Sequence, residues 1–233
     1  RDTATPASVD DAVFRFRADG SPDGTDSRPT NGPKPGVYRY SIRGAERIDA
    51  LLDSRHDYDH PSTVTVSRDG CSLIERSDLL EERWTRWEFC LSPNRRRLRA
   101  LTEFHQFFGV SVRERYRCSG ASVPRAAALR PGFDWTDRCS GRDASVTLRG
   151  RVVGIEKLTV AGKRVDTVHL RFTARPRGRI SGSRTVDSWL LRSNGLLARR
   201  SEKSDIRISG LPTGSARSRE RYTMRLRSLK PLG

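Results

Sequence analysis

The sequence predicts an all-β fold with a minor helical part, built from two related antiparallel units that form curved sheets or open half-barrels. Three observations support this: apolar and polar residues alternate over many segments, Gly-containing turns separate the segments, and helical periodicity is weak. Within residues 110–118, for example, one parity holds four apolar residues and Glu114, and the other holds Ser111 and three arginines. Near the C-terminus Tyr222, Met224 and Leu226 alternate in the same way. We interpret such segments as half-buried strands whose arginines face outward.

The N-terminal part and the middle of the chain differ from this pattern. Residues 1–35 are dense in Asp, Ser, Thr, Gly and Pro, which predicts a flexible tether with a short ordered piece at Val13–Phe16. Helix is expected only at Ala45–Leu52 and Val123–Leu129, where small and aliphatic residues have helical spacing. Residues 119–131, with two prolines and an alanine run, are interpreted as a connector.

A weak internal sequence repeat indicates that the remaining strands form two units. Arg113–Tyr116 recurs as Arg219–Tyr222, and the Gly-aromatic segment at Gly36 is echoed at Gly132. We therefore assign residues 36–118 to a first β unit and residues 132–233 to a second. The further strands expected in the second unit are Val146–Val160, Arg164–Arg175, Ser183–Leu191 and Leu196–Ile208.

Four cysteines are present, and their spacings match no zinc-binding template. A hairpin through Ser77–Glu82 would bring Cys71 near Cys90, while Cys118 ends the first unit and Cys139 follows the opening strand of the second. The preferred pairing is therefore Cys71–Cys90 and Cys118–Cys139. Together with a chain that starts without Met, this cysteine usage predicts an exported, oxidised protein. Four buried cytosolic thiols are the alternative.

The net charge is +17, and 40 of the 45 basic residues are Arg. Residues 132–233 hold 23 basic and 9 acidic residues, a field that would attract an anionic envelope polymer or a membrane surface. A solvated Arg-rich face, or GC-rich codons, would explain the same composition. Nucleic acid is not expected as a partner, and no apolar run reaches the length that a membrane helix needs.

The final strand holds the candidate contacts for an anionic partner. These are four arginines of one parity, expected to share one face: Arg219, Arg221, Arg225 and Arg227. Like charges at this spacing repel, so we expect carboxylates to be partly interleaved with them. By strand order, the acids within reach are Asp187, Glu202 and Asp205.

Catalytic and metal-binding motifs are not found. The sequence holds no nucleophile elbow, phosphate-binding loop, dinucleotide fingerprint or zinc-protease helix, so we predict a protein that is not an enzyme, without catalytic residues or a cofactor. His56 and His60 could share a metal on a helix, but Pro61 and the intervening acids disfavour one. We interpret this segment as solvated and predict no functional metal.

Large aromatic residues are the candidate ligand contacts. In a sheet protein most of them fill the core, but a sheet that curves without closing would turn its concave face into an apolar trough. The candidate lining residues are Tyr38, Tyr40, Trp87, Tyr116, Trp135, Phe172, Trp189 and Tyr222.

The second half of the chain resembles a family of exported bacterial cell-envelope proteins of unknown function. The matching motifs are Phe133-Asp134-Trp135, the run Gly150–Glu156, Val160-Ala161-Gly162 with Val165–Val168, and Trp189 with Gly195-Leu196-Leu197. The resemblance implies curved antiparallel sheets similar to lipoprotein-carrier half-barrels, which hold acyl chains in an open trough. It implies no catalytic residue. The additional N-terminal copy and the cysteines depart from the family.

These observations predict an exported, non-enzymatic protein of the cell envelope that binds a hydrophobic or amphiphilic ligand, such as a lipid, in a curved-sheet trough. Arginines would meet an anionic headgroup at the rim of the trough. One alternative is an Arg-rich binding module for an anionic wall polymer or membrane surface. A structural or scaffold subunit is the other.

Overall fold

The computed structural model describes residues 4–19, 32–49, 53–107, 109–211 and 214–233, and it confirms the all-β fold. One α-helix, α1 (Val9–Ala18), precedes the strands, and one turn of 3-10 helix, η1 (Ala126–Ala128), follows β7. The strands are β1 (Gly36–Asp49), β2 (Asp53–Asp69), β3 (Ser72–Leu80), β4 (Arg83–Leu91), β5 (Arg95–Phe107), β6 (Val110–Ser119), β7 (Ser122–Pro124), β8 (Asp134–Ser140), β9 (Ala144–Val160), β10 (Lys163–Gly178), β11 (Ile180–Leu191), β12 (Leu197–Leu211) and β13 (Gly214–Leu226).

All of these strands belong to one antiparallel sheet, which closes on itself. β1 to β6 pair in chain order, and so do β8 to β13. The two runs are joined by β1–β13 pairing on one side and by β6–β8 pairing on the other, while the short β7 adds to the start of β5. The predicted concave faces are therefore enclosed inside a ring of strands rather than left open as a trough. The assignment of residues 36–118 and 132–233 to two related units stays a prediction.

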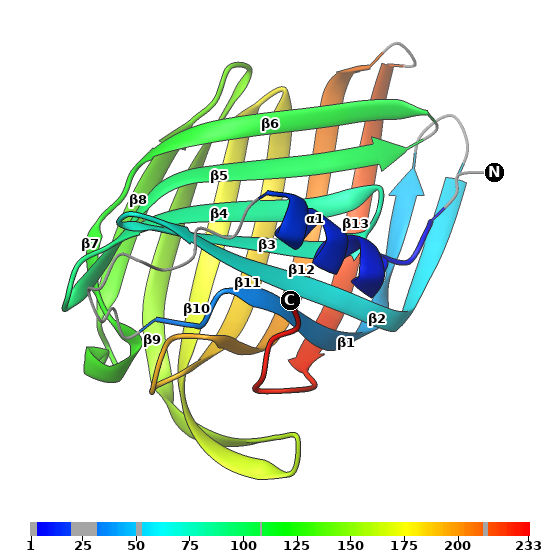
Figure 1. The fold of residues 1–233 in the computed structure, drawn as a ribbon. Helices are drawn as coiled ribbons and strands as arrows, with labels where there is room; N and C mark the ends of the chain where they lie inside the picture. Colours follow the sequence, from blue (N-terminus) through cyan, green and yellow to red (C-terminus); the bar gives the residue numbers. More distant parts are fainter. Residues whose placement is uncertain (1–3, 20–31, 50–52, 108, 212–213) are drawn as a thin grey trace.

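The core lies between two layers of this sheet. In Figure 1, β3 to β6 cross in front of β9 to β13, so the inner faces of the two runs face each other. Alternation along each strand sends every second side chain inward. The largest fully buried side chains include Tyr38, Tyr40, Tyr58 and Tyr116. Buried phenols normally require hydrogen-bond partners, so these tyrosines are the first indication of polar groups in the interior.

Helix α1 lies within the predicted tether. Ser8 caps it by accepting a hydrogen bond from the Asp11 backbone N–H, and Ala12 and Phe16 pack on Val37 of β1. A side-chain ion pair of 3.3 Å between Arg15 Nη2 and Asp78 Oδ2 ties the helix to β3. The ordered piece predicted at Val13–Phe16 is therefore longer than expected and spans Val9–Ala18, and residues 20–31 lie outside the described ranges.

Both helices predicted from the sequence are wrong. Residues 45–49 continue β1, because pairing with β13 and β2 on either side overrides their weak helical spacing, and residues 50–52 are outside the described part. Residues 123–129 contribute the end of β7 and η1. Among the described residues, no helix has the length and apolar character to cross a membrane.

Two disulfides have the pairing that the sequence predicted. The first, which we call the hairpin disulfide, joins Cys71 to Cys90 beside the β3–β4 hairpin, with 4.9 Å between the Cα atoms. The second, the seam disulfide, joins Cys118 of β6 to Cys139 of β8, with a Cα–Cα distance of 3.9 Å. Only three residue pairs join β6 to β8, so the seam disulfide crosses the shortest junction of the ring.

Candidate functional site

The interior of the ring holds many ionisable side chains among its apolar ones. Acidic side chains come from Glu46, Glu75, Glu103, Asp137, Glu202 and Glu220, and basic ones from Arg83, Arg96, Arg184 and Arg200. Buried charges are costly unless they are paired. The functional question is therefore which of these groups are paired and which are not.

One paired group surrounds Arg83, which β4 brings across the interior to β13. Its Nε and Nη2 atoms donate to the Glu220 carboxylate at 2.9 and 2.5 Å. The Tyr58 hydroxyl donates to the same carboxylate at 2.7 Å, and Ser218 Oγ donates to Glu46 at 2.7 Å. Glu46 and Glu220 are direct cross-strand neighbours, so Arg83 offsets the repulsion between two carboxylates.

Burial and these like charges shift the titration of the Arg83 group. Burial, with the nearby Glu46 and Glu202 carboxylates, raises the pKa of Glu220 to about 7, although Arg83 opposes the shift. Burial and the positive charges of Arg83 and Arg184 hold the pKa of His105 well below its usual value, so His105 is neutral in neutral solution. The group is a satisfied network that links the two layers.

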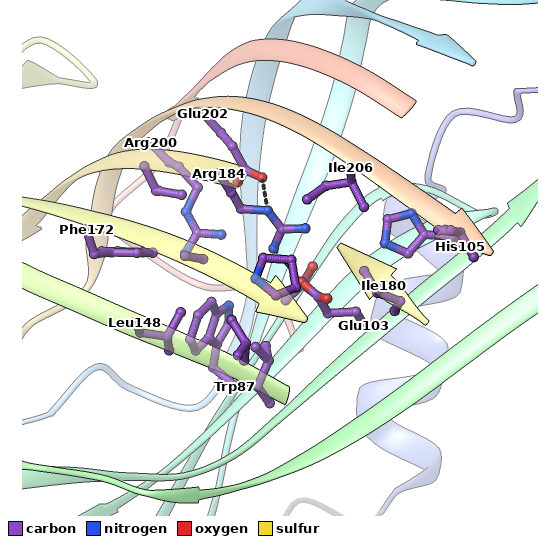
Figure 2. A pocket seen from close by; sticks show the side chains of 17 residues that line it. Trp87, Glu103, His105, Leu148, Phe172, Ile180, Arg184, Arg200, Glu202 and Ile206 are labelled. Carbon is purple, nitrogen blue, oxygen red and sulfur yellow. Dashed lines mark hydrogen bonds and ion pairs between the residues drawn. The ribbon is translucent and has the colours of Figure 1, made fainter. Parts of the chain in front are cut away.

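A second paired group surrounds Arg184 of β11 (Figure 2). Its guanidinium contacts the Glu103 carboxylate, and its Nε lies 3.0 Å from Glu202 Oε1. The Tyr222 hydroxyl donates to the other Glu202 oxygen at 2.8 Å. Arg184 is therefore held between carboxylates of the two facing layers, as Arg83 is.

Arg200 differs from both. Only 9% of its surface is exposed, yet within the described residues it makes neither an ion pair nor a hydrogen bond. In Figure 2 its side chain extends into the same cavity as Arg184, beside Phe172. Two further donors of this cavity region, Trp87 Nε1 and Ser188 Oγ, are also buried without a partner. Three unsatisfied donors at one place indicate a position for acceptor atoms that the protein does not supply.

The space around Arg200 is a series of adjoining cavities. The first, of about 20 Å³, shares Trp87, Leu148, Phe172 and Arg200 with a second of about 80 Å³. The second is lined mainly by apolar side chains, which include Phe89, Leu98, Trp135, Leu170, Leu190 and Leu197. A third cavity, of about 210 Å³, adjoins it at Glu75 and Arg96 and extends to the loops around Asn94 and Asn194. Together they form an apolar interior with isolated charges.

Two carboxyl groups face the second cavity beside these arginines. Burial raises the pKa of Glu75, although Arg96 and Arg200 oppose the shift, and burial likewise raises the pKa of Asp137. The Ala121 backbone N–H donates to Asp137 at 2.6 Å, whereas Glu75 has no ion pair closer than 4 Å in the described chain. These acids reduce the positive potential at Arg200 without neutralising it by contact.

The structure brings together most of the predicted ligand contacts. Trp87, Trp135 and Phe172 line the second cavity. The four predicted tyrosines, Tyr38, Tyr40, Tyr116 and Tyr222, also lie on the inner face, where they are fully or almost fully buried in the core. Arg200, Ser188 and the two acids were missed from the sequence, because polar residues also occupy the outward positions of the same strands.

The prediction for Trp189 is wrong, because it alternates with Ser188 and Leu190, which line the cavity. It lies on the outer face, stacked on His169 with 4.2 Å between ring centroids. The two nitrogens of His169 contact Glu156 and Asp187 at 2.8 and 2.7 Å. Trp189 Nε1 donates to Glu156 at 2.8 Å. All groups in this outer cluster have partners, so it offers nothing to a ligand.

The four predicted arginines, three of them in β13 and Arg227 just beyond its end, are all exposed, and carboxylates are partly interleaved with them. Arg219 pairs with Asp49, whereas Arg221, Arg225 and Arg227 have no ion pair within the described ranges. Asp205 pairs with Arg217 instead, at 2.6 Å, and Asp187 contacts Arg171. The expectation for Glu202 is wrong, since its side chain points inward to Arg184.

The two histidines considered for metal binding lie on strand β2 rather than in a solvated segment, and His56 is buried. His56 lies beside Glu46, 3.6 Å from its nearest oxygen, and His60 Nδ1 contacts the Pro61 carbonyl oxygen at 2.7 Å. In the part of the chain that the structure describes, no group of three His, Cys, Asp or Glu side chains is arranged to hold a metal ion.

Fold and site together define a closed all-β protein with a partly hollow, charged interior. No known protein family matches the sequence, and no curated protein matches it either. Among solved structures, the crystal structure of the hypothetical lipoprotein YmcC from Escherichia coli aligns with a TM-score of 0.38 and 14% identity, over 90% of this chain and 95% of that chain. So distant a likeness says nothing about a ligand, and membership of the envelope family stays a prediction.

Proposed function

We propose that the protein binds a small amphiphile with an anionic group, whose charge contacts Arg200 and whose apolar part fills the adjoining cavities. One observation supports this most directly: Arg200, with 9% of its surface exposed, has no hydrogen-bond or ion-pair partner in the described chain and lines a largely apolar cavity. A bound carboxylate or sulfate would supply the missing acceptor atoms, and hydrogen bonds to charged groups are worth about 1.5–3 kcal/mol each.

The surroundings of Arg200 support an amphiphile rather than a free inorganic anion. Leu148, Leu170 and Phe172 line the same cavity as Arg200, and covering their surfaces with a ligand would contribute about 25 cal/mol for each Å². The third cavity offers about 210 Å³ for a short chain that leaves the second cavity between Glu75 and Arg96. The ligand would be held without any covalent step.

Both disulfides support the extracytoplasmic part of this proposal, because such bonds persist in oxidising compartments. An exported binding protein in the cell envelope encounters lipids and their breakdown products. A fatty acid or a related anionic amphiphile is the class of ligand that the cavity chemistry fits.

Octanoate and 1-octanol test the proposal, because they share one chain and differ in charge. Isothermal titration of the intact protein is expected to give at least about 10-fold tighter binding for octanoate, from one charge-assisted contact. The Arg200→Met variant should lose this preference. The control variant Arg207→Met changes an exposed arginine of the same strand and should retain it. Equal binding of both compounds, or octanoate binding that survives in Arg200→Met, would overturn the proposal.

A further inference from the structure

The outer face of the sheet divides into two regions of different charge balance. Across β13 and its neighbours, one end of the face interleaves acids with arginines: Arg219 pairs with Asp49, and Arg217 with Asp205 through two hydrogen bonds of 2.7 and 2.6 Å. In each of these ion pairs, a carboxylate of the protein already offsets the charge of the arginine. This end therefore has little to offer an anionic partner.

The other end of the same strands forms a shallow depression of about 840 Å³, which we call the basic groove. Four arginines rim it: Arg39 and Arg43 of β1, with Arg225 and Arg227 at and just beyond the end of β13. Its floor includes the small side chains of Ser41, Pro61 and Thr223. Among the residues that the structure describes, the groove has one acid, Asp59, which lies 3.4 Å from Arg43 with 81% of its side chain exposed. Within the same residues, the other three arginines make no ion pair.

Helix α1 packs on the same outer face of β1, next to the strand segment that lines the groove, and exposed apolar side chains lie on this part of the face. Val37, two positions before Arg39 on the same face of β1, is covered by Ala12 and Phe16 of α1. Phe14, between these two buried residues, projects away from the sheet with 73% of its surface exposed. Leu232, which pairs with Val37, is 37% exposed. Water is an unfavourable environment for an apolar side chain, so burying Phe14 and Leu232 in an apolar partner would be favourable.

We infer that the basic groove and Phe14 dock the protein on an anionic lipid bilayer. The arginines fit a dense layer of phosphate groups, and a Phe side chain beside them fits the apolar boundary beneath that layer. A soluble anionic polymer would satisfy the arginines but would leave Phe14 in water. The inference does not depend on the proposed ligand in the interior, because the two surfaces lie on opposite faces of the strands.

Vesicle sedimentation at low salt tests the docking surface. With equimolar phosphatidylcholine and phosphatidylglycerol, replacing Arg225 and Arg227 by Gln should weaken binding about 30-fold, from about 1 kcal/mol for each arginine. The matched control replaces Arg217 and Arg219 by Gln: it removes the same charge from the same strand, but at the paired end, and should change binding less than about 3-fold. Equal effects of the two double variants would show that only net charge matters and would overturn the inference.

Two further arms separate a bilayer from other anionic partners. Phe14→Ser should weaken vesicle binding by about 30-fold at every salt concentration, because about 2 kcal/mol of apolar burial is lost and salt does not screen it. Vesicles of phosphatidylcholine alone should bind neither the unmodified protein nor the variants. If Phe14→Ser binds vesicles normally, or if the protein binds soluble polyphosphate but no vesicles, the surface is a polymer site and the inference fails.

Discussion

Replacing Arg200 should stabilise the protein, whereas replacing Arg184 should destabilise it. Both guanidiniums are almost fully buried and belong to neighbouring strands, but Arg184 contacts Glu103 and Glu202, while Arg200 has no contact of this kind in the described chain. An unpaired buried charge costs several kcal/mol of solvation free energy that no contact returns. Methionine has a similar length and fits the apolar walls, so it removes this cost at Arg200.

The two substitutions should differ in sign and by a large amount. Arg200→Met is expected to raise the free energy of unfolding by about 1–4 kcal/mol, the stabilisation found when buried ion pairs are replaced by apolar side chains. Arg184→Met leaves two buried carboxylates without their partner and should lower it by about 3–5 kcal/mol. The exposed Arg207→Met serves as the control and should stay within about 0.5 kcal/mol of the unmodified protein.

Urea unfolding, followed by tryptophan fluorescence, measures these differences, and equal m-values across the series would show that the variants unfold by the same transition. If Arg200→Met is as destabilised as Arg184→Met, Arg200 has a structural partner, such as an ordered water network. The reasoning that assigns it to a ligand would then be refuted. If Arg200→Met is more stable than the unmodified protein and no longer binds octanoate, Arg200 lowers the stability of the fold and is required for binding.

Three further outcomes follow from the interior charges and the disulfides. Replacing both cysteines of the seam disulfide by Ser should lower the free energy of unfolding by about 3 kcal/mol, and so should the same change at the hairpin disulfide, because the two bonds close loops of similar length, 21 and 19 positions. Hydrogen exchange should rise in β6 and β8 for the seam variant only. The free energy of unfolding should fall by about 1 kcal/mol per pH unit as pH rises from 4.5 towards 7, because folding raises the pKa of Glu220 from 4.5 to about 7. In urea titrations, the free energy of unfolding of Glu220→Gln should depend less on pH over this range. Octyl sulfate, which stays ionised, should bind more tightly as the pH falls and the raised pKa of Glu75 is crossed; calorimetry of Glu75→Gln should show tight binding already at neutral pH.

Much of the fold could be predicted because its evidence is local. Alternation along residues 110–118 and 221–227 places Tyr116 and Met224 inside and the arginines outside, as the structure does. Helix α1 was missed although its signals were present: a Ser8 cap, acids in the first turn and Arg15 in the last. Only two of its residues, Ala12 and Phe16, are buried, because it packs on the outer face of the sheet rather than in the core.

The charged interior could not be predicted in the same way. Arg83 and Glu220 are 137 positions apart in the sequence, and no local pattern predicts that a charged residue of one strand will pair with a residue of the opposite layer. β12 has polar residues at both parities, so Arg200 and Glu202 look like any solvated pair. Whether a charge is buried with a partner or without one depends on the facing layer, which alternation does not describe.

Closure of the ring has a consequence for how the chain folds. β1 pairs with β13, and their side chains Glu46 and Ser218, which lie 172 positions apart, are hydrogen-bonded. The first strand therefore has no permanent neighbour on one side until the last strand has been made. A nascent chain exposes this edge, with its buried tyrosines, throughout synthesis. Non-local closure of this kind makes folding slow, so the chain needs protection from aggregation until its final strand arrives.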